Sequence, residues 1–69
     1  SWERYYIKDG YLMCANKLCI PKSSLRLLLL QESHGGGLMG HFGRDKTFAT
    51  LSKSYFWPKM FRDVNRFTN

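Results

Sequence analysis

A short glycine-rich segment between two histidines constrains this chain more than any other feature. Residues 35–40 hold four glycines in six positions, and His34 and His41 flank them. Each glycine inside a helix would cost roughly 0.5–1 kcal/mol, so we expect a loop here. Regular structure must therefore stop before this segment and start again after it.

The length allows one small domain. A chain of 69 residues buries a modest share of its surface, so such domains often depend on a metal, a disulfide or a partner. The composition, 43% hydrophobic and 16% aromatic, is too apolar for a disordered chain. The leucine run at residues 27–30 is far too short to span a membrane, so no membrane partner is expected. The N-terminus lacks both a signal-peptide pattern and an initiator Met, which favours a fragment or a processed piece.

The net charge of +6 favours a polyanionic partner, and nucleic acid is the commonest one. Exposed cations on the predicted helices are the candidates for contacts with DNA phosphates, namely Lys53, Lys59, Arg62 and Arg66. A basic but merely solvated surface is the alternative. Tyr55, Phe56 and Trp57 could stack on bases, although their spacing beside Leu51 and Met60 is more typical of a core.

The first part of the chain reads as a β-meander. Aromatic and β-branched residues at 5–7 precede the Asp9-Gly10 turn signal, and residues 11–14 can return antiparallel. A second turn at residues 15–17 leads into residues 18–20, and Pro21 ends that strand because it removes a backbone donor.

Helix signals follow Pro21. Ser23 or Ser24 can cap a helix that runs to about Ser33. Its apolar stripe is Leu25, Leu28 and Leu29, widened by Leu27 and Leu30, and Arg26, Gln31 and Glu32 are expected to face solvent. A second helix is expected from Gly43 to about Tyr55. A third is expected with Pro58 in its first turn, and its inner face is Met60, Phe61, Val64 and Phe67. The fold class is therefore α+β, with a meander extension at 1–22 and a three-helix bundle at 23–69.

His34 and His41 are candidate metal ligands because glycine allows the chain between them to turn tightly. Neutral imidazole binds Zn²⁺ well, yet a structural zinc site needs four protein ligands. Two loop histidines without a metal are the alternative that spacing alone leaves open.

Several motifs together resemble a known family. They are residues 34–43 (HGGGLMGHFG), Lys46-Thr47, Leu51, residues 55–60 (YFWPKM) and Asp63-Val64, and upstream residues 9–12 and 20–21. This combination, which covers essentially the whole chain, resembles the His-His-Cys-Cys domain of gypsy-type LTR retrotransposon integrases, those of plant elements in particular.

The resemblance implies a non-catalytic, helix-turn-helix-like bundle that holds Zn²⁺ through His34, His41 and a Cys-x-x-Cys pair. That pair is expected beyond Asn69, so the site in this chain would be incomplete. The resemblance also implies integrase self-association, binding of element DNA ends, no small-molecule substrate, and action in the nucleus after a cytoplasmic particle stage. The parent Pol polyprotein would carry the enzymatic activities.

Cys14 and Cys19 offer another way to complete the site. If the hairpin turn is centred on Asn16-Lys17, the two thiols face each other and could join His34 and His41 around a metal. The alternatives are that they are small apolar residues or, in an oxidising setting only, a cross-strand disulfide.

Catalysis has little support in the sequence. The acidic residues are scattered, without the clustered carboxylates that metal-assisted DNA cleavage needs. A nucleophilic pair of Cys19 with His34 or His41 lacks an evident third orienting group. Besides an integrase accessory domain, a domesticated host protein-interaction module and a free-standing DNA-binding domain remain open as functions.

Overall fold

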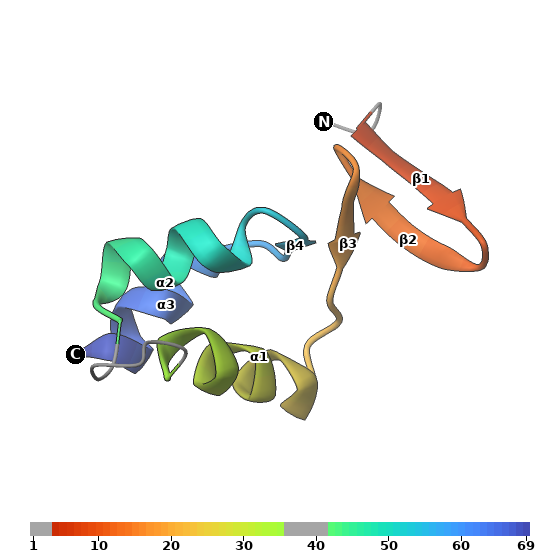
Figure 1. Ribbon diagram of the computed structural model, residues 1–69. Helices are drawn as coiled ribbons and strands as arrows, with labels where there is room; N and C mark the ends of the chain where they lie inside the picture. Colours follow the sequence, from red (N-terminus) through yellow and green to blue (C-terminus); the bar gives the residue numbers. More distant parts are fainter. Residues whose placement is uncertain (1–3, 36–41) are drawn as a thin grey trace.

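The computed structural model describes residues 4–35 and 42–69, which form a four-stranded sheet and three helices. In chain order the elements are β1 (Tyr5–Lys8), β2 (Tyr11–Cys14), β3 (Lys17–Cys19), α1 (Ser24–His34), α2 (Arg44–Leu51), β4 (Tyr55–Phe56) and α3 (Met60–Thr68). Figure 1 shows the hairpin of β1 and β2 at one end of the molecule and the helices at the other. The predicted α+β class is confirmed.

Two-residue turns connect the first three strands into the predicted meander. Asp9 and Gly10 have φ values of 52° and 84°, and Ala15 and Asn16 have 50° and 65°. Two consecutive positive φ values characterise the type I′ turn, whose twist matches that of an antiparallel hairpin. The hydroxyl of Tyr6 donates a 2.7 Å hydrogen bond to Oδ1 of Asn16, which fastens the second turn to β1.

The fourth strand, β4, was not predicted, and it replaces the last turn of the expected second helix. α2 ends at Leu51 instead of Tyr55, because the chain turns and Tyr55–Phe56 pairs in parallel with β3. The amide of Leu18 donates to the carbonyl of Ser54 at 2.9 Å, and the amide of Ile20 donates to that of Phe56 at 3.0 Å. β4 thereby attaches the meander to the helices.

The apolar face predicted for α1 is partly right, and its cap is confirmed. Ser23 Oγ accepts the amide of Leu25. Leu30 is buried and Leu29 packs against the core, whereas Leu25, Leu27 and Leu28 are exposed. Arg26, which was expected to face solvent, instead turns inward and donates to the carbonyl oxygen of Ile20 from Nε at 3.0 Å and Nη2 at 2.8 Å. Its guanidinium also lies 5.3 Å from the centre of the Trp57 ring.

The third helix begins two residues later than expected. Pro58 lies in a turn before α3, and Lys59 caps the helix in the left-handed region, at φ 63°. Phe61, expected on the inner face, is 46% exposed, whereas Met60 and Val64 are buried. The main core lies between the helices and β4, and it consists of Ile20, Leu30, Leu51, Trp57, Met60 and Val64.

Two other expectations about the architecture stay predictions. A strand stands between α2 and α3, and nothing further bears on their helix-turn-helix relationship. The division of the chain at residue 22 is likewise untested. No helix among the described residues has the length and apolar character that crossing a membrane requires.

Candidate metal centre and its surroundings

His34 is the last residue of α1 and lies where the three helices converge. Its ring packs edge-on against Phe67 of α3, with 5.5 Å between ring centres and an interplanar angle of 87°. Its carbonyl oxygen accepts a 2.7 Å hydrogen bond from the amide of Phe42, just before α2. The chain therefore returns to the end of α1 as soon as the glycine-rich segment is over. His41 itself lies outside the described residues.

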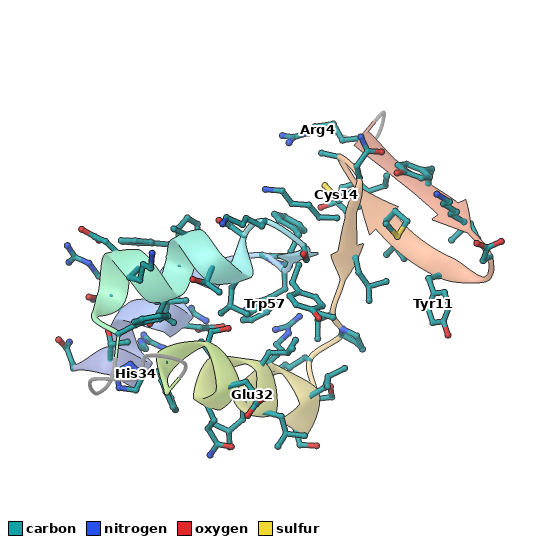
Figure 2. All side chains as sticks on the ribbon, in the orientation of Figure 1. Arg4, Tyr11, Cys14, Glu32, His34 and Trp57 are labelled. Atoms are coloured by element: carbon teal, nitrogen blue, oxygen red, sulfur yellow. The ribbon has the colours of Figure 1, made fainter. Side chains whose placement is uncertain are left out.

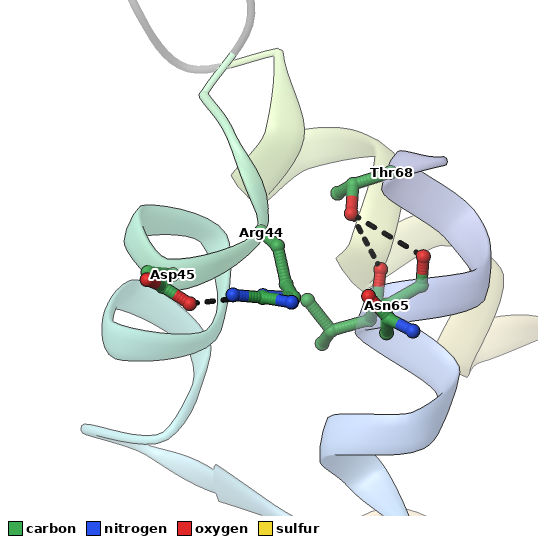
Figure 3. Close-up of polar contacts among 5 residues, drawn as sticks. Arg44, Asp45, Asn65 and Thr68 are labelled. Atoms are coloured by element: carbon green, nitrogen blue, oxygen red, sulfur yellow. Dashed lines mark hydrogen bonds and ion pairs between the residues drawn. The ribbon is translucent and has the colours of Figure 1, made fainter.

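The C-terminal end of α3 lies at the same place. Thr68 Oγ donates to the carbonyls of Val64, at 3.0 Å, and Asn65, at 3.5 Å, which closes the last turn of the helix (Figure 3). Figure 1 shows this end of the chain beside the end of α1. The end of α3 therefore lies close to His34, as does the start of α2.

The cysteines do not complete a site with His34. Cys14 pairs with Lys17, so the turn is formed by Ala15 and Asn16. The alternative with the turn centred on Asn16-Lys17 is therefore wrong, and the two thiols do not lie directly opposite each other. Figure 2 shows Cys14 in the hairpin and His34 at the far end of the helices. Across residues 4–35 and 42–69, no three His, Cys, Asp or Glu side chains are grouped so that they could hold a metal. The fit for Zn²⁺ therefore rests on His34 and its position.

The thiols are free and poorly suited to nucleophilic chemistry. Cys14 is buried and Cys19 half-buried. Burial raises the pKa of the Cys19 thiol, and the neighbouring Cys14 raises it further. A raised pKa lowers the thiolate fraction, which is the reactive form. Cys19 is the last residue of β3 and His34 the last residue of α1, so the length of α1 separates the two members of this weakly supported pair (Figure 1).

The four predicted phosphate-contacting cations are all exposed. Lys53 lies in the turn after α2, Lys59 caps α3, and Arg62 and Arg66 follow one turn apart on α3. Arg62 also donates to Oδ1 of Asp63, from Nε at 3.2 Å and Nη2 at 3.1 Å. The positions of Lys59, Arg62 and Arg66 permit phosphate contacts along α3, and contact with DNA stays a prediction.

Trp57 is a core residue rather than a base-stacking platform. It is 1% exposed, and its Nε1 donates a 2.9 Å hydrogen bond to Oδ2 of Asp63. Tyr55 and Phe56 are half-buried. Sequence reasoning missed two cations, Arg4 and Lys17, which join Lys59 around a hollow beside β4. No local pattern indicates this grouping, because it depends on the parallel pairing of β3 with β4.

Comparison with known proteins identifies a family that covers most of the chain. Residues 21–69 match the family described as the integrase zinc binding domain. The Pro-Pol polyprotein of Simian foamy virus type 3 (strain LK3) is 33% identical over 64 residues, which is 88% of this chain and 5% of that protein. The Pro-Pol polyprotein of Feline foamy virus is 35% identical over 48 residues, 70% of this chain and 4% of that protein.

The chain thus spans about a twentieth of the length of these relatives. They are polyproteins of foamy viruses, so the narrower assignment to gypsy-type elements of plants stays a prediction. The matched family is a non-catalytic zinc-binding domain, and it implies Zn²⁺. On the match over residues 21–69, this chain belongs to the integrase zinc-binding domain family.

Proposed function

We propose that this domain is a zinc-stabilised accessory module of DNA integration, which supports self-association of an integrase and contacts the DNA ends of the element. The observation that carries the proposal is the convergence on His34 of the start of α2 and the end of α3, through Phe42 and Phe67. A metal bound at this point would join segments that are far apart in the sequence. In a domain with so small a core, that link adds directly to folding stability.

In this proposal His34 and His41 supply two zinc ligands, and a Cys-x-x-Cys pair following α3 supplies the other two. Zn²⁺ contributes a closed structural site and no reaction. Other parts of the chain position these ligands. α1 and the Phe67 ring hold the His34 imidazole, and the Phe42 amide brings the chain after His41 back to it.

DNA contact is assigned to Lys53, Lys59, Arg62 and Arg66. Their support is exposure and the basic balance of the chain, since cations on a helix surface neutralise phosphates without reading sequence. Action on element ends would take place in the nucleus, after a cytoplasmic particle stage. A domesticated host module that kept only protein contacts would bind no DNA.

Zinc stoichiometry and affinity test the metal part. The 69-residue chain is compared with a version extended at its C-terminus through a Cys-x-x-Cys segment. We expect the extended version to bind one Zn²⁺ tightly and to gain thermal stability, and His34→Gln to remove both effects. Cys14→Ser is the control and should change neither. Tight binding by the 69-residue chain that disappears with Cys14→Ser would contradict the proposed ligand set.

A salt titration tests the DNA part. The double variant Arg62→Gln/Arg66→Gln is compared with Lys8→Gln/Lys22→Gln, which has the same net charge. Loss of two phosphate contacts should lower the salt slope of duplex binding by about 0.9 per contact, and the control pair should not. Equal slopes for the two variants would remove α3 from the DNA interface. Sedimentation of the zinc-loaded extended chain tests self-association, and a monomer at all concentrations would reject that role.

A further inference from the structure

A hollow of about 410 Å³ opens where the meander meets the helices. Its walls come from the N-terminal end of β1, β3, α2, β4 and α3, so no single element builds it. Its volume lies within the range of about 300–1,000 Å³ that is typical of small-ligand sites. The hollow exists only because β4 adds to β3 in parallel and brings the start of α3 next to Lys17.

Aromatic rings form much of the lining. Phe48 and Phe61 pack edge-to-face with ring centres 5.1 Å apart, and Phe56 lies in the same lining. Phe61 is 46% exposed, so a substantial part of a large apolar side chain faces solvent. The Arg44 guanidinium lies 5.5 Å from the centre of the Phe61 ring, so the ring already makes one cation–π contact. The part of the Phe61 ring that stays exposed offers a flat apolar surface to another ring.

Three cations line the same hollow: Arg4 just before β1, Lys17 in β3 and Lys59 at the cap of α3. No acidic side chain is among its described lining residues. The ion pairs found in the described part of the chain involve Arg44 and Arg62, so these three charges are not neutralised by a carboxylate there. Figure 2 shows the Arg4 side chain extending away from the hairpin.

Lys59 also has an unusual backbone. Its φ of 63° lies in the left-handed region, which for a residue with a side chain costs on the order of 1 kcal/mol. Glycine would avoid this strain, yet a lysine stands at the edge of an aromatic hollow. Positive charge around exposed rings is complementary to a ligand that has both an anionic group and a flat aromatic group.

We propose that this hollow binds an unpaired nucleotide of a DNA strand, with its base against Phe61 and its flanking phosphates beside Arg4, Lys17 and Lys59. This inference rests on the proposed DNA-contacting function and deepens it by naming the form of DNA recognised. A base inside a duplex has both faces covered by its neighbours, whereas an unpaired nucleotide presents a free face. Stacking of this kind tolerates any base, so little sequence preference is expected.

The test uses the 69-residue chain and three fluorescent probes in anisotropy titrations at low salt. The probes are a ten-nucleotide oligothymidine, an abasic strand of the same length, and a blunt duplex. The abasic strand keeps the phosphates and lacks the bases, so it separates stacking from charge. We expect oligothymidine to bind at least about fivefold more tightly than the abasic strand, the effect of one stacked base.

Two variants locate the binding. Phe61→Leu should abolish the preference for oligothymidine over the abasic strand and leave abasic binding unchanged. Lys17→Gln/Lys59→Gln should weaken binding of both strands, and the equally charged Lys8→Gln/Lys22→Gln should not. Circular dichroism verifies that each variant is folded. If Phe61→Leu fails to fold, amide shift changes at Lys17, Lys59 and Phe61 of the unaltered chain during oligothymidine titration replace it.

The outcomes separate this inference from the proposed function. Equal affinity for oligothymidine and the abasic strand, or no effect of Phe61→Leu, would overturn the nucleotide site. Duplex binding that depends on Arg62 and Arg66 would then still support the proposed function. Conversely, base-dependent oligothymidine binding without any duplex binding would support the hollow and count against the α3 interface.

Discussion

The indole Nε1 of Trp57 donates a 2.9 Å hydrogen bond to Oδ2 of Asp63, and this bond joins the segment after β4 to the first turn of α3. Trp57 is 1% exposed, so water has little access to its ring. The other carboxylate oxygen, Oδ1, accepts from the guanidinium of Arg62. Asp63 therefore satisfies a donor within the core and also one at the surface.

Replacing Asp63 should show what this bond contributes. Asp63→Ala leaves the buried Trp57 N–H without an acceptor, and we expect it to lower the free energy of unfolding by about 1–3 kcal/mol. Asp63→Asn keeps an oxygen that can accept the bond, and its effect should be smaller. Urea denaturation followed by Trp fluorescence measures both. Equal losses in the two variants would show that the Trp57 bond is not the stabilising contact.

Asp63 should also make stability depend on pH in the acid range. Burial alone would raise its pKa, but the hydrogen bonds from Trp57 and Arg62 and the charges of Arg62 and Arg26 outweigh burial and lower it. A lowered pKa in the folded state means that the stabilisation is present above the ordinary value of 3.8 and is lost as the pH falls through the lowered pKa.

The difference in unfolding free energy between wild type and Asp63→Asn isolates this contribution. We expect the difference to be constant between pH 5 and 7, and to shrink as the pH is lowered below about 4. Thermal melts over this pH series measure it. A difference that grows on acidification would have the wrong sign for a lowered pKa.

Truncating a leucine should lower stability much more on the buried face of α1 than on the exposed face. Leu30 is 6% exposed and belongs to the core, so Leu30→Ala should cost about 2–4 kcal/mol. Leu28 is 56% exposed, and Leu28→Ala should change stability by less than about 0.5 kcal/mol. Both changes remove the same atoms from the same helix. Comparable losses in urea denaturation would mean that another surface covers Leu28.

The error about α1 shows where sequence patterns stop being informative. With five leucines among six consecutive residues, several stripes are equally apolar, and the choice depends on the other side chains. Arg26 faces inward because the Ile20 carbonyl accepts its bonds, and that carbonyl is positioned only once β3 has ended. Hydrophobic periodicity contains no information about such an acceptor.

Features governed by local rules were predicted well. Asp9-Gly10 and the Ser23 cap depend on a few adjacent residues, and both are confirmed. β4 depends instead on parallel pairing with a distant strand, and the spacing of Phe48, Leu51 and Tyr55 suits a continued helix equally well. For the site, the sequence identified His34 at the end of α1. It could not supply the Cys14–Lys17 register, in which the residue opposite Cys14 is two positions before Cys19, the partner that facing thiols need.

The turn between β2 and β3 gives a prediction with opposite signs at two alanines. Ala15 has a φ of 50°, where a Cβ atom is strained, and its amide donates a 3.0 Å hydrogen bond to the carbonyl of Arg4. Ala15→Gly keeps this bond and removes the strain, so we expect a gain of about 0.5–1 kcal/mol despite the greater freedom of the unfolded chain. Ala49 lies exposed within α2, where Ala49→Gly should instead cost about 1 kcal/mol. Urea denaturation of both variants checks the pair. Destabilisation by both would show that the backbone at Ala15 is not strained and that the type I′ geometry of this turn is wrong.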